Sequence, residues 1–124
     1  MELAFRIAER AVGLTAPNPP VGVVIVKDRE ILSRGWTQLK GSPHAEIHAI
    51  NQVKDKTLLK GATMYSTLEP CSHRGKNPPC VNIIIRSKFK KVVIAQKDKN
   101  PLVNGDGIRK LRRNGIKVTQ SKFA

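Results

Sequence analysis

The stretch "VGVVIVKDREILSRGW", residues 21–36, contains two runs of the kind that form β-strands, 21–27 and 30–36. Only Asp28 and Arg29 separate the two runs, and this spacing predicts a β-hairpin. The first run is apolar at nearly every position, so both of its faces should be covered. We therefore expect it to be an interior strand of a sheet that carries helices on both sides.

Outward from this hairpin, helical and strand-like segments alternate along the chain. Apolar residues spaced as on one helix face run through 2–13, and the proline-rich stretch 14–20 cannot continue that helix. Further helices are expected at about 44–54, 81–87 and 108–114, and further strands at 62–68, 90–96 and 116–119. This order predicts an α/β fold, a three-layer α-β-α sandwich with a mixed five-stranded sheet.

Length and composition are those of one compact domain. With 124 residues, 40% of them hydrophobic, the chain can bury one core, and we expect a single domain over residues 1–124. The first residues mix charges with apolar positions, unlike a secretory signal. The longest apolar runs, "VGVVIV" and "VNIII", are too short to cross a membrane. These features predict a cytoplasmic protein.

The chain carries a large excess of positive charge. Its 23 Lys and Arg residues against 9 Asp and Glu residues give a formal net charge of +14. Such a charge attracts anions, including nucleic acids and phosphorylated metabolites. The lysines are scattered, however, and aromatic residues make up only 4% of the chain, so platforms for stacking bases are scarce. Charge alone therefore gives weak support for a nucleic-acid partner.

The stretch "PHAEIHAI", residues 43–50, places His44, Glu46 and His48 within five positions. His44 and His48 would share a helix face, as the two histidines of the H-E-x-x-H metalloproteases do. In that motif the glutamate follows the first histidine directly, whereas Glu46 stands two positions after His44. The pattern therefore disfavours a protease.

Two cysteines, Cys71 and Cys80, follow in "TLEPCSHRGKNPPC", residues 67–80. A histidine and two thiolates form a tetrahedral zinc set with one position open for water, as in catalytic sites. Cys80 is expected at a helix N-terminus, which favours the thiolate, and His44 at the start of another helix. The three could meet around one ion, with Glu46 beside the bound water. A disulfide between the cysteines is the alternative, which an intracellular compartment disfavours.

Four stretches together resemble a known family: "PNPPVGVVIV" (17–26), "HAEIHAI" (44–50), "TLEPCSHRGKNPPC" (67–80) and "NGDGIRKLRRNGIKV" (104–118). Zinc deaminases combine H-x-E with P-C-x-x-C. Here eight residues separate the two cysteines, and the long loop between them is specific. The chain resembles the deaminases of riboflavin biosynthesis, the diaminohydroxyphosphoribosylaminopyrimidine deaminases, within the cytidine deaminase-like superfamily.

The resemblance implies the roles of individual residues. His44, Cys71 and Cys80 would bind zinc together with a water molecule, and Glu46 would transfer protons. The reaction would be hydrolysis of a cyclic amidine C–N bond, converting 2,5-diamino-6-(5-phosphoribosylamino)pyrimidin-4(3H)-one to 5-amino-6-(5-phosphoribosylamino)uracil and ammonia. Three further residues would contact base, ribose and phosphate: Asn18, His73 and Lys76.

The chain departs from the family pattern at several positions. Thr37 stands where a histidine is usual, Arg29 replaces a common turn glycine, and Lys99 interrupts the usual D-P-N-P. Arg29 should strain or lengthen the hairpin without affecting the chemistry. Relatives commonly continue into a reductase domain, which is absent from these residues, so a separate reductase polypeptide is expected. Superfamily members also commonly associate through helices near the site, which leaves a homo-oligomer open.

Two other functions compete with this interpretation. A tRNA adenosine or free-nucleoside deaminase would share the fold and the zinc and would fit the positive charge, but the long cysteine loop disfavours it. A catalytically silent, zinc-stabilised binding domain would have no use for Glu46.

Several polar residues near these motifs are interpreted as structural. His48 is expected to be a partly buried helix histidine with an ordinary hydrogen bond and no metal. Glu69 should shape the end of its strand. Gly105 and Gly107 are expected to form a plain turn and not a phosphate-binding loop.

Overall fold

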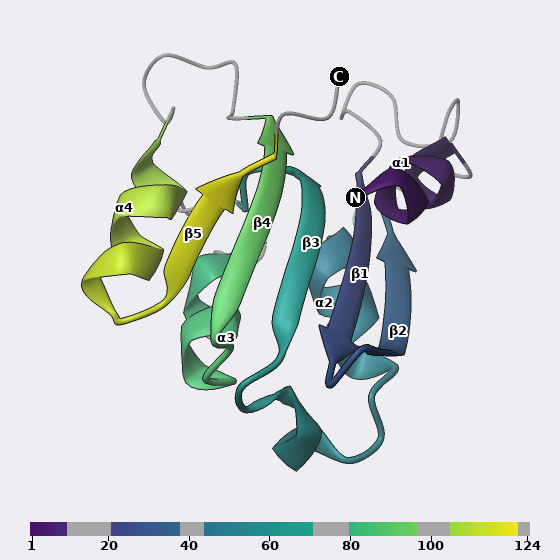
Figure 1. The fold of residues 1–124 in the computed structure, drawn as a ribbon, viewed down its shortest axis with the longest axis horizontal. Helices are drawn as coiled ribbons and strands as arrows, with labels where there is room; N and C mark the ends of the chain where they lie inside the picture. The colour runs from purple at the N-terminus through teal and green to yellow at the C-terminus, as the bar shows by residue number, and fades with distance from the viewer. Residues whose placement is uncertain (10–20, 38–43, 71–79, 97–104, 122–124) are drawn as a thin grey trace.

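A computed structural model of the chain describes residues 1–9, 21–37, 44–70, 80–96 and 105–121. Within them lies a five-stranded sheet in the order β2-β1-β3-β4-β5 (Figure 1). The strands are β1 (Gly22–Lys27), β2 (Glu30–Trp36), β3 (Thr63–Leu68), β4 (Lys91–Gln96) and β5 (Lys117–Gln120). β1 is antiparallel to β2 and β3, whereas β3, β4 and β5 run parallel. The prediction of a mixed five-stranded sheet is confirmed.

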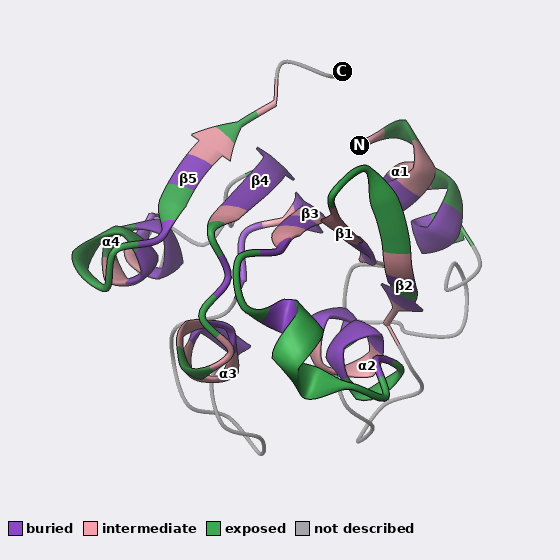
Figure 2. Ribbon diagram, turned by 60° about the horizontal axis from the view of Figure 1, so that its bottom comes forward, coloured by how far each residue is buried: buried purple, intermediate pink, exposed green. Residues whose placement is uncertain are grey.

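Helices cover both faces of this sheet. They are α1 (Glu2–Ala8), α2 (Ala45–Asn51), α3 (Cys80–Arg86) and α4 (Asp106–Arg113). The sheet separates α1 from α2 and α3 (Figure 2). Helix α4 joins β4 to β5. Its buried residues Ile108 and Leu111 belong to the same apolar cluster as Ala49 of α2 and Ile84 of α3. The structure is therefore the predicted α-β-α sandwich.

The side chains of β1 alternate between the two helical layers. Val23 and Ile25, both fully buried, belong to the large core under α2, α3 and α4. Val24 points the other way and packs with Ala4 and Ile7 of α1. Complete burial of such a side chain contributes about 1.5–3 kcal/mol. An apolar strand between two covered faces is what the sequence predicted for β1.

The hairpin between β1 and β2 turns through two residues, as predicted. Asp28 and Arg29 have φ angles of 51° and 67°, in the left-handed region that favours glycine. Lys27 pairs directly with Glu30, so the turn itself is not lengthened. The consequence of Arg29 is therefore backbone strain. Further along β2 the register shifts, and Leu32 is the extra residue of a β-bulge.

Helix α2 ends three residues before the predicted boundary. The Lys56 ammonium group donates to carbonyls at the end of the helix, with a distance of 2.8 Å to the Ile50 oxygen. Asp55 then caps a 3₁₀-helix, Lys56–Leu59, by accepting from the Thr57 backbone N–H at 3.0 Å. Both side chains satisfy backbone groups that a longer helix would have paired within itself, so α2 can end early. The predicted helix, which ran to about residue 54, did not include these side-chain contacts.

The remaining boundaries agree with the predictions to within two residues, except at the first helix, whose described helical part is Glu2–Ala8. Residues 10–20, 38–43, 71–79 and 97–104 lie outside the described part of the chain, and with them the predicted loops. Among the residues that the structure describes, no helix has the length and apolar character needed to cross a membrane.

Candidate metal centre

The direction of the strands brings the starts of α2 and α3 to one edge of the sheet. β2 and β3 are both antiparallel to β1, so they run in the same direction. The segments that follow them leave the sheet at the same edge. α2 begins after the first of these segments and α3 after the second. Residues at the two helix starts can therefore meet although they are far apart in the sequence.

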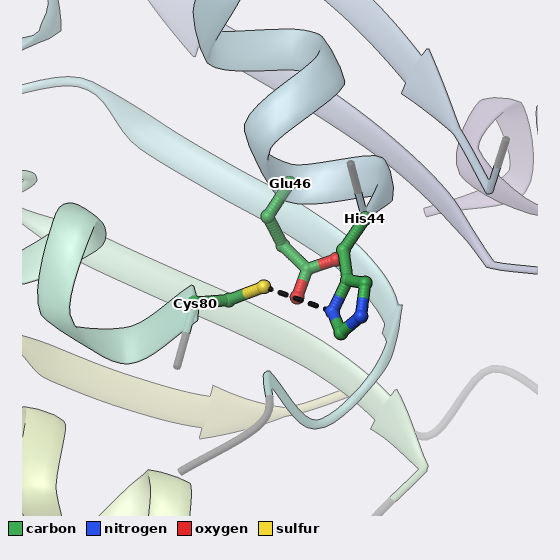
Figure 3. A group of neighbouring side chains, drawn as sticks. All are labelled: His44, Glu46 and Cys80. Carbon is green, nitrogen blue, oxygen red and sulfur yellow. Dashed lines mark hydrogen bonds between the residues drawn. The ribbon is translucent and has the colours of Figure 1, made fainter. Parts of the chain in front are cut away.

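His44 and Cys80 occupy these two positions and contact each other. His44 is the N-cap of α2, and Cys80 is the first residue of α3. The Nδ1 atom of His44 lies 3.2 Å from the Cys80 sulfur, a contact across 36 residues (Figure 3). Cys80 is fully buried, whereas His44 is exposed. The pair is accessible from the His44 side.

Glu46 completes the cluster from the first turn of α2. Its side chain is 5% exposed, and its carboxylate points toward the other two side chains (Figure 3). One ligand atom from each of His44, Glu46 and Cys80 lies within 4.8 Å of the other two. A carboxylate in the first turn of a helix also interacts favourably with the helix dipole.

The chemistry of these donors suits a metal ion such as zinc. Thiolate sulfur and imidazole nitrogen are the ligands that zinc prefers, and they already lie side by side. A carboxylate at this distance can either bind the ion or act on a water beside it. Among the described residues, these three form the one group that could hold a metal.

Four of the expected site residues lie outside the described part of the chain, as does Lys99. They are the expected ligand Cys71 and the expected substrate contacts Asn18, His73 and Lys76. Their roles remain predictions.

Two residues of β2 hold α2 close to the sheet. The Ser33 hydroxyl donates to the Ala49 carbonyl at 2.7 Å. A Cβ atom added at Gly35 would lie 2.4 Å from the Ala45 carbonyl oxygen, so the helix backbone rests directly on this glycine. The sequence analysis did not predict this role of Gly35, although a glycine inside a strand can indicate that another backbone segment approaches closely.

His48 has the structural role expected of it. Its Nδ1 accepts a hydrogen bond from the Trp36 backbone N–H at 3.2 Å, and the two rings meet edge to face with centroids 4.7 Å apart. This side chain therefore fixes α2 to the end of β2 and is not part of the metal-binding group.

Glu69 shapes the strand end, as expected, but through contacts that no local pattern indicates. Its side chain is 5% exposed, and its two carboxylate oxygens accept hydrogen bonds from the backbone N–H groups of Gly105 (3.0 Å), Gly107 (2.9 Å) and Ile108 (3.4 Å). Helix α4 is thereby capped from β3, and it begins two residues before the predicted start. The prediction of a plain turn at Gly105 and Gly107 is wrong: Gly105 is the N-cap of α4 and Gly107 lies inside the helix, and both N–H groups donate to Glu69.

Thr37, where the family resemblance leads us to expect a histidine, continues the pairing of β1 with β2. Its backbone N–H donates to the Val21 carbonyl at 3.0 Å, and its hydroxyl accepts from the Val21 N–H at 2.7 Å. In this protein the position holds two backbone segments together.

Comparisons with known proteins agree with this geometry. Residues 1–96 match the family described as "Cytidine and deoxycytidylate deaminase zinc-binding region". Riboflavin biosynthesis protein RibD of Aquifex aeolicus is 50% identical over 118 residues, which are 95% of this chain and 33% of that protein. Diaminohydroxyphosphoribosylamino-pyrimidine deaminase of Buchnera aphidicola from Schizaphis graminum is 46% identical over 118 residues, 95% of this chain and 79% of that protein.

A solved structure of a RibD protein has the same fold as this chain. RibD of Acinetobacter baumannii has a TM-score of 0.92 and 44% sequence identity, covering 96% of this chain and 33% of that one. The chain therefore spans about a third of the length of the RibD proteins it matches.

Proposed function

Because the chain belongs to the family of zinc-binding cytidine and deoxycytidylate deaminases, and within it to the diaminohydroxyphosphoribosylaminopyrimidine deaminases, we propose that it is a hydrolytic deaminase of riboflavin biosynthesis. The reaction takes water and 2,5-diamino-6-(5-phosphoribosylamino)pyrimidin-4(3H)-one to 5-amino-6-(5-phosphoribosylamino)uracil and ammonia. The observation that carries this proposal is the contact of His44 with Cys80 beside the buried Glu46.

The residues that would hold zinc are His44, Cys71 and Cys80. The 3.2 Å contact between the His44 Nδ1 and the Cys80 sulfur supports the first and third, and the family resemblance supports Cys71. A bound zinc ion lowers the pKa of water, so that hydroxide is available near neutral pH.

Glu46 is the proton-transfer group. It accepts one proton from the water whose oxygen bonds to the ring carbon, and it delivers that proton to the ring nitrogen. The second proton of the same water passes to the amine, whose C–N bond then breaks to release ammonia. Its position in the first turn of α2 supports this role, because the helix fixes the carboxylate beside His44 and Cys80. Burial keeps competing water away from the carboxylate.

The base, ribose and phosphate of the substrate are contacted by Asn18, His73 and Lys76. A lysine ammonium group is a suitable partner for a phosphate because it is a point charge on a flexible stem. The net charge of +14 would favour capture of an anionic substrate.

In the pathway context, residues 1–124 act as one deaminase domain. A reductase would use the uracil product next, as the name of a solved relative indicates. The occurrence of deaminase and reductase in one solved relative from Thermotoga maritima supports this functional pairing. Copies of the chain could also associate with each other.

The test is ammonia release by the purified, zinc-loaded chain with the phosphoribosylated diaminopyrimidinone, with zinc content measured on the same sample. Glu46→Gln is the matched control, because it keeps the shape of the side chain and removes its basicity. We expect turnover by the wild type and a loss of at least about 100-fold in Glu46→Gln at unchanged zinc content. Zinc binding without turnover on this substrate would contradict the proposal, and turnover on dCMP, free nucleosides or tRNA would replace it.

A further inference from the structure

The carboxylate of Glu69 joins two parts of the fold that the proposed reaction does not otherwise connect. It is buried between the end of β3 and the start of α4. It accepts hydrogen bonds from three backbone N–H groups, those of the N-cap of α4 and of two residues in the first turn of that helix. A helix is usually capped by the side chain of its own N-cap residue. The N-cap of α4 is Gly105, which has no side chain, and the cap comes from a residue 36 positions earlier.

The backbone around Glu69 is held from a second direction. Its N–H donates to the Gln96 carbonyl at the end of β4, with a distance of 2.8 Å. The next residue, Pro70, is fully buried. A Cβ atom added at Gly107 would lie 2.4 Å from the Pro70 carbonyl oxygen, so α4 rests against the backbone of Pro70. Glu69 and Pro70 are therefore fixed by both β4 and α4.

We propose that Glu69 is a positioning residue for the metal centre, acting through Cys71. Cys71 directly follows Pro70 in the sequence. The contacts that fix Glu69 and Pro70 therefore hold the residue to which this expected ligand is bonded. Metal ligands held by a rigid surrounding shell bind more tightly than ligands on an unconstrained backbone. This inference rests on the proposed function, in which Cys71 binds zinc.

The role also accounts for the two glycines of the "NGDG" motif. Gly105 has a φ angle of 84°, which favours glycine, and it presents its N–H to one oxygen of Glu69. Gly107 allows the close approach to Pro70 and presents its N–H to the other oxygen. Both glycines serve the backbone beside the expected ligand and not an external phosphate.

The experiment measures metal binding by the full chain in four variants. Glu69→Gln removes one acceptor oxygen. Gly107→Ala keeps the Glu69 carboxylate but pushes α4 away from Pro70, and its Cβ would also lie 3.2 Å from a Glu69 oxygen. Asp55→Asn makes the same carboxylate-to-amide change at the cap before β3, where Asp55 accepts from Thr57. Gly61→Ala adds a Cβ at a glycine with a φ angle of 80° and no atom within 4 Å. Zinc affinity is measured by chelator competition, and Co²⁺ is used to record the thiolate-to-metal absorption.

We expect Glu69→Gln and Gly107→Ala to weaken zinc binding by about 10–100-fold and to reduce the thiolate-to-cobalt absorption per bound ion. The two controls should keep the wild-type affinity to within about twofold, even where their melting temperature falls. Wild-type affinity and absorption in both Glu69→Gln and Gly107→Ala would overturn the proposal and leave Glu69 as a helix cap only. Should Glu69→Gln fail to fold, Gly107→Ala decides the question alone.

Cys71→Ser separates this inference from the proposed function. If that variant keeps the full cobalt absorption, Cys71 is not a ligand, and both the proposed zinc set and the role of Glu69 are wrong. If Cys71→Ser lowers the absorption per bound ion while Glu69→Gln and Gly107→Ala keep it at the wild-type value, the zinc set stands and only the role of Glu69 is refuted.

Discussion

Replacement of Gly35 by alanine should displace helix α2 without changing any of the proposed site residues. The added Cβ would lie 2.4 Å from the Ala45 carbonyl oxygen and 2.6 Å from the Ala49 backbone nitrogen. Ordinary van der Waals contact begins at 3.4 Å. Both neighbours are backbone atoms of α2, so the helix must move by about 1 Å in a core that cannot absorb the change. His44 and Glu46, on either side of Ala45, would move with it.

The substitution should lower both the stability of the fold and the rate of turnover. Overpacking of this kind costs about 1–3 kcal/mol of folding free energy. With an unfolding entropy of about 2.1 cal/mol/K per residue over 124 residues, the melting temperature should fall by about 4–12 °C. A displacement of about 1 Å in a catalytic group can lower the rate by about 100-fold. We therefore expect kcat to fall by about that factor at temperatures well below the melting point.

The assay is ammonia release together with zinc content and a thermal melt of the same sample. Gly115→Ala is the control, because Gly115 has a φ angle of 83° and no atom within 4 Å of the added Cβ. That variant should lose stability and keep its turnover. If Gly35→Ala retains turnover to within about threefold of wild type, the close packing of α2 on β2 does not position the site and the reasoning is wrong.

Four further changes test other parts of the structure. Cys80→Ser should weaken zinc binding by more than the roughly 100-fold typical of an outer-shell change, and full zinc occupancy at low metal concentration would exclude Cys80 as a ligand. Arg29→Gly should raise the melting temperature by about 2–4 °C, because glycine relieves the positive φ of an exposed turn residue, whereas Arg34→Gly in the exposed face of β2 should lower it. Hydrogen bonds from the side chain and then the backbone N–H of Thr57 lower the pKa of Asp55. The stability that Asp55 contributes is therefore present above its unfolded pKa and is lost as pH falls through the lower folded pKa, so the melting curves of Asp55→Asn and wild type should converge below about pH 4 and differ at pH 7. Lys76→Ala should raise KM about tenfold for the phosphorylated substrate and little for its dephosphorylated form, and an equal effect on both would remove Lys76 from the phosphate site.

Much of the fold could be predicted because its signals are local. The two-residue spacing at Asp28 and Arg29 predicted the hairpin, and the apolar run of β1 predicted a strand covered on both faces. These patterns depend on residues only a few positions apart. The expectation that His44 and Cys80 start two helices was of the same kind, since a helix start is read from the residues around it.

The contacts that hold the site together depended on the tertiary structure. Nothing near Glu69 in the sequence indicates that it caps α4, and nothing near Ala45 indicates that Gly35 lies beneath it. Such pairs are set by the order and direction of strands, which bring distant segments to one edge of the sheet. The sequence by itself determined which residues are candidates for chemistry, and it indicated that His44 and Cys80 stand at helix starts. Only the packing of those elements decided that His44, Glu46 and Cys80 share one place, because a distance across 36 residues is a property of the assembled sheet and not of any local stretch.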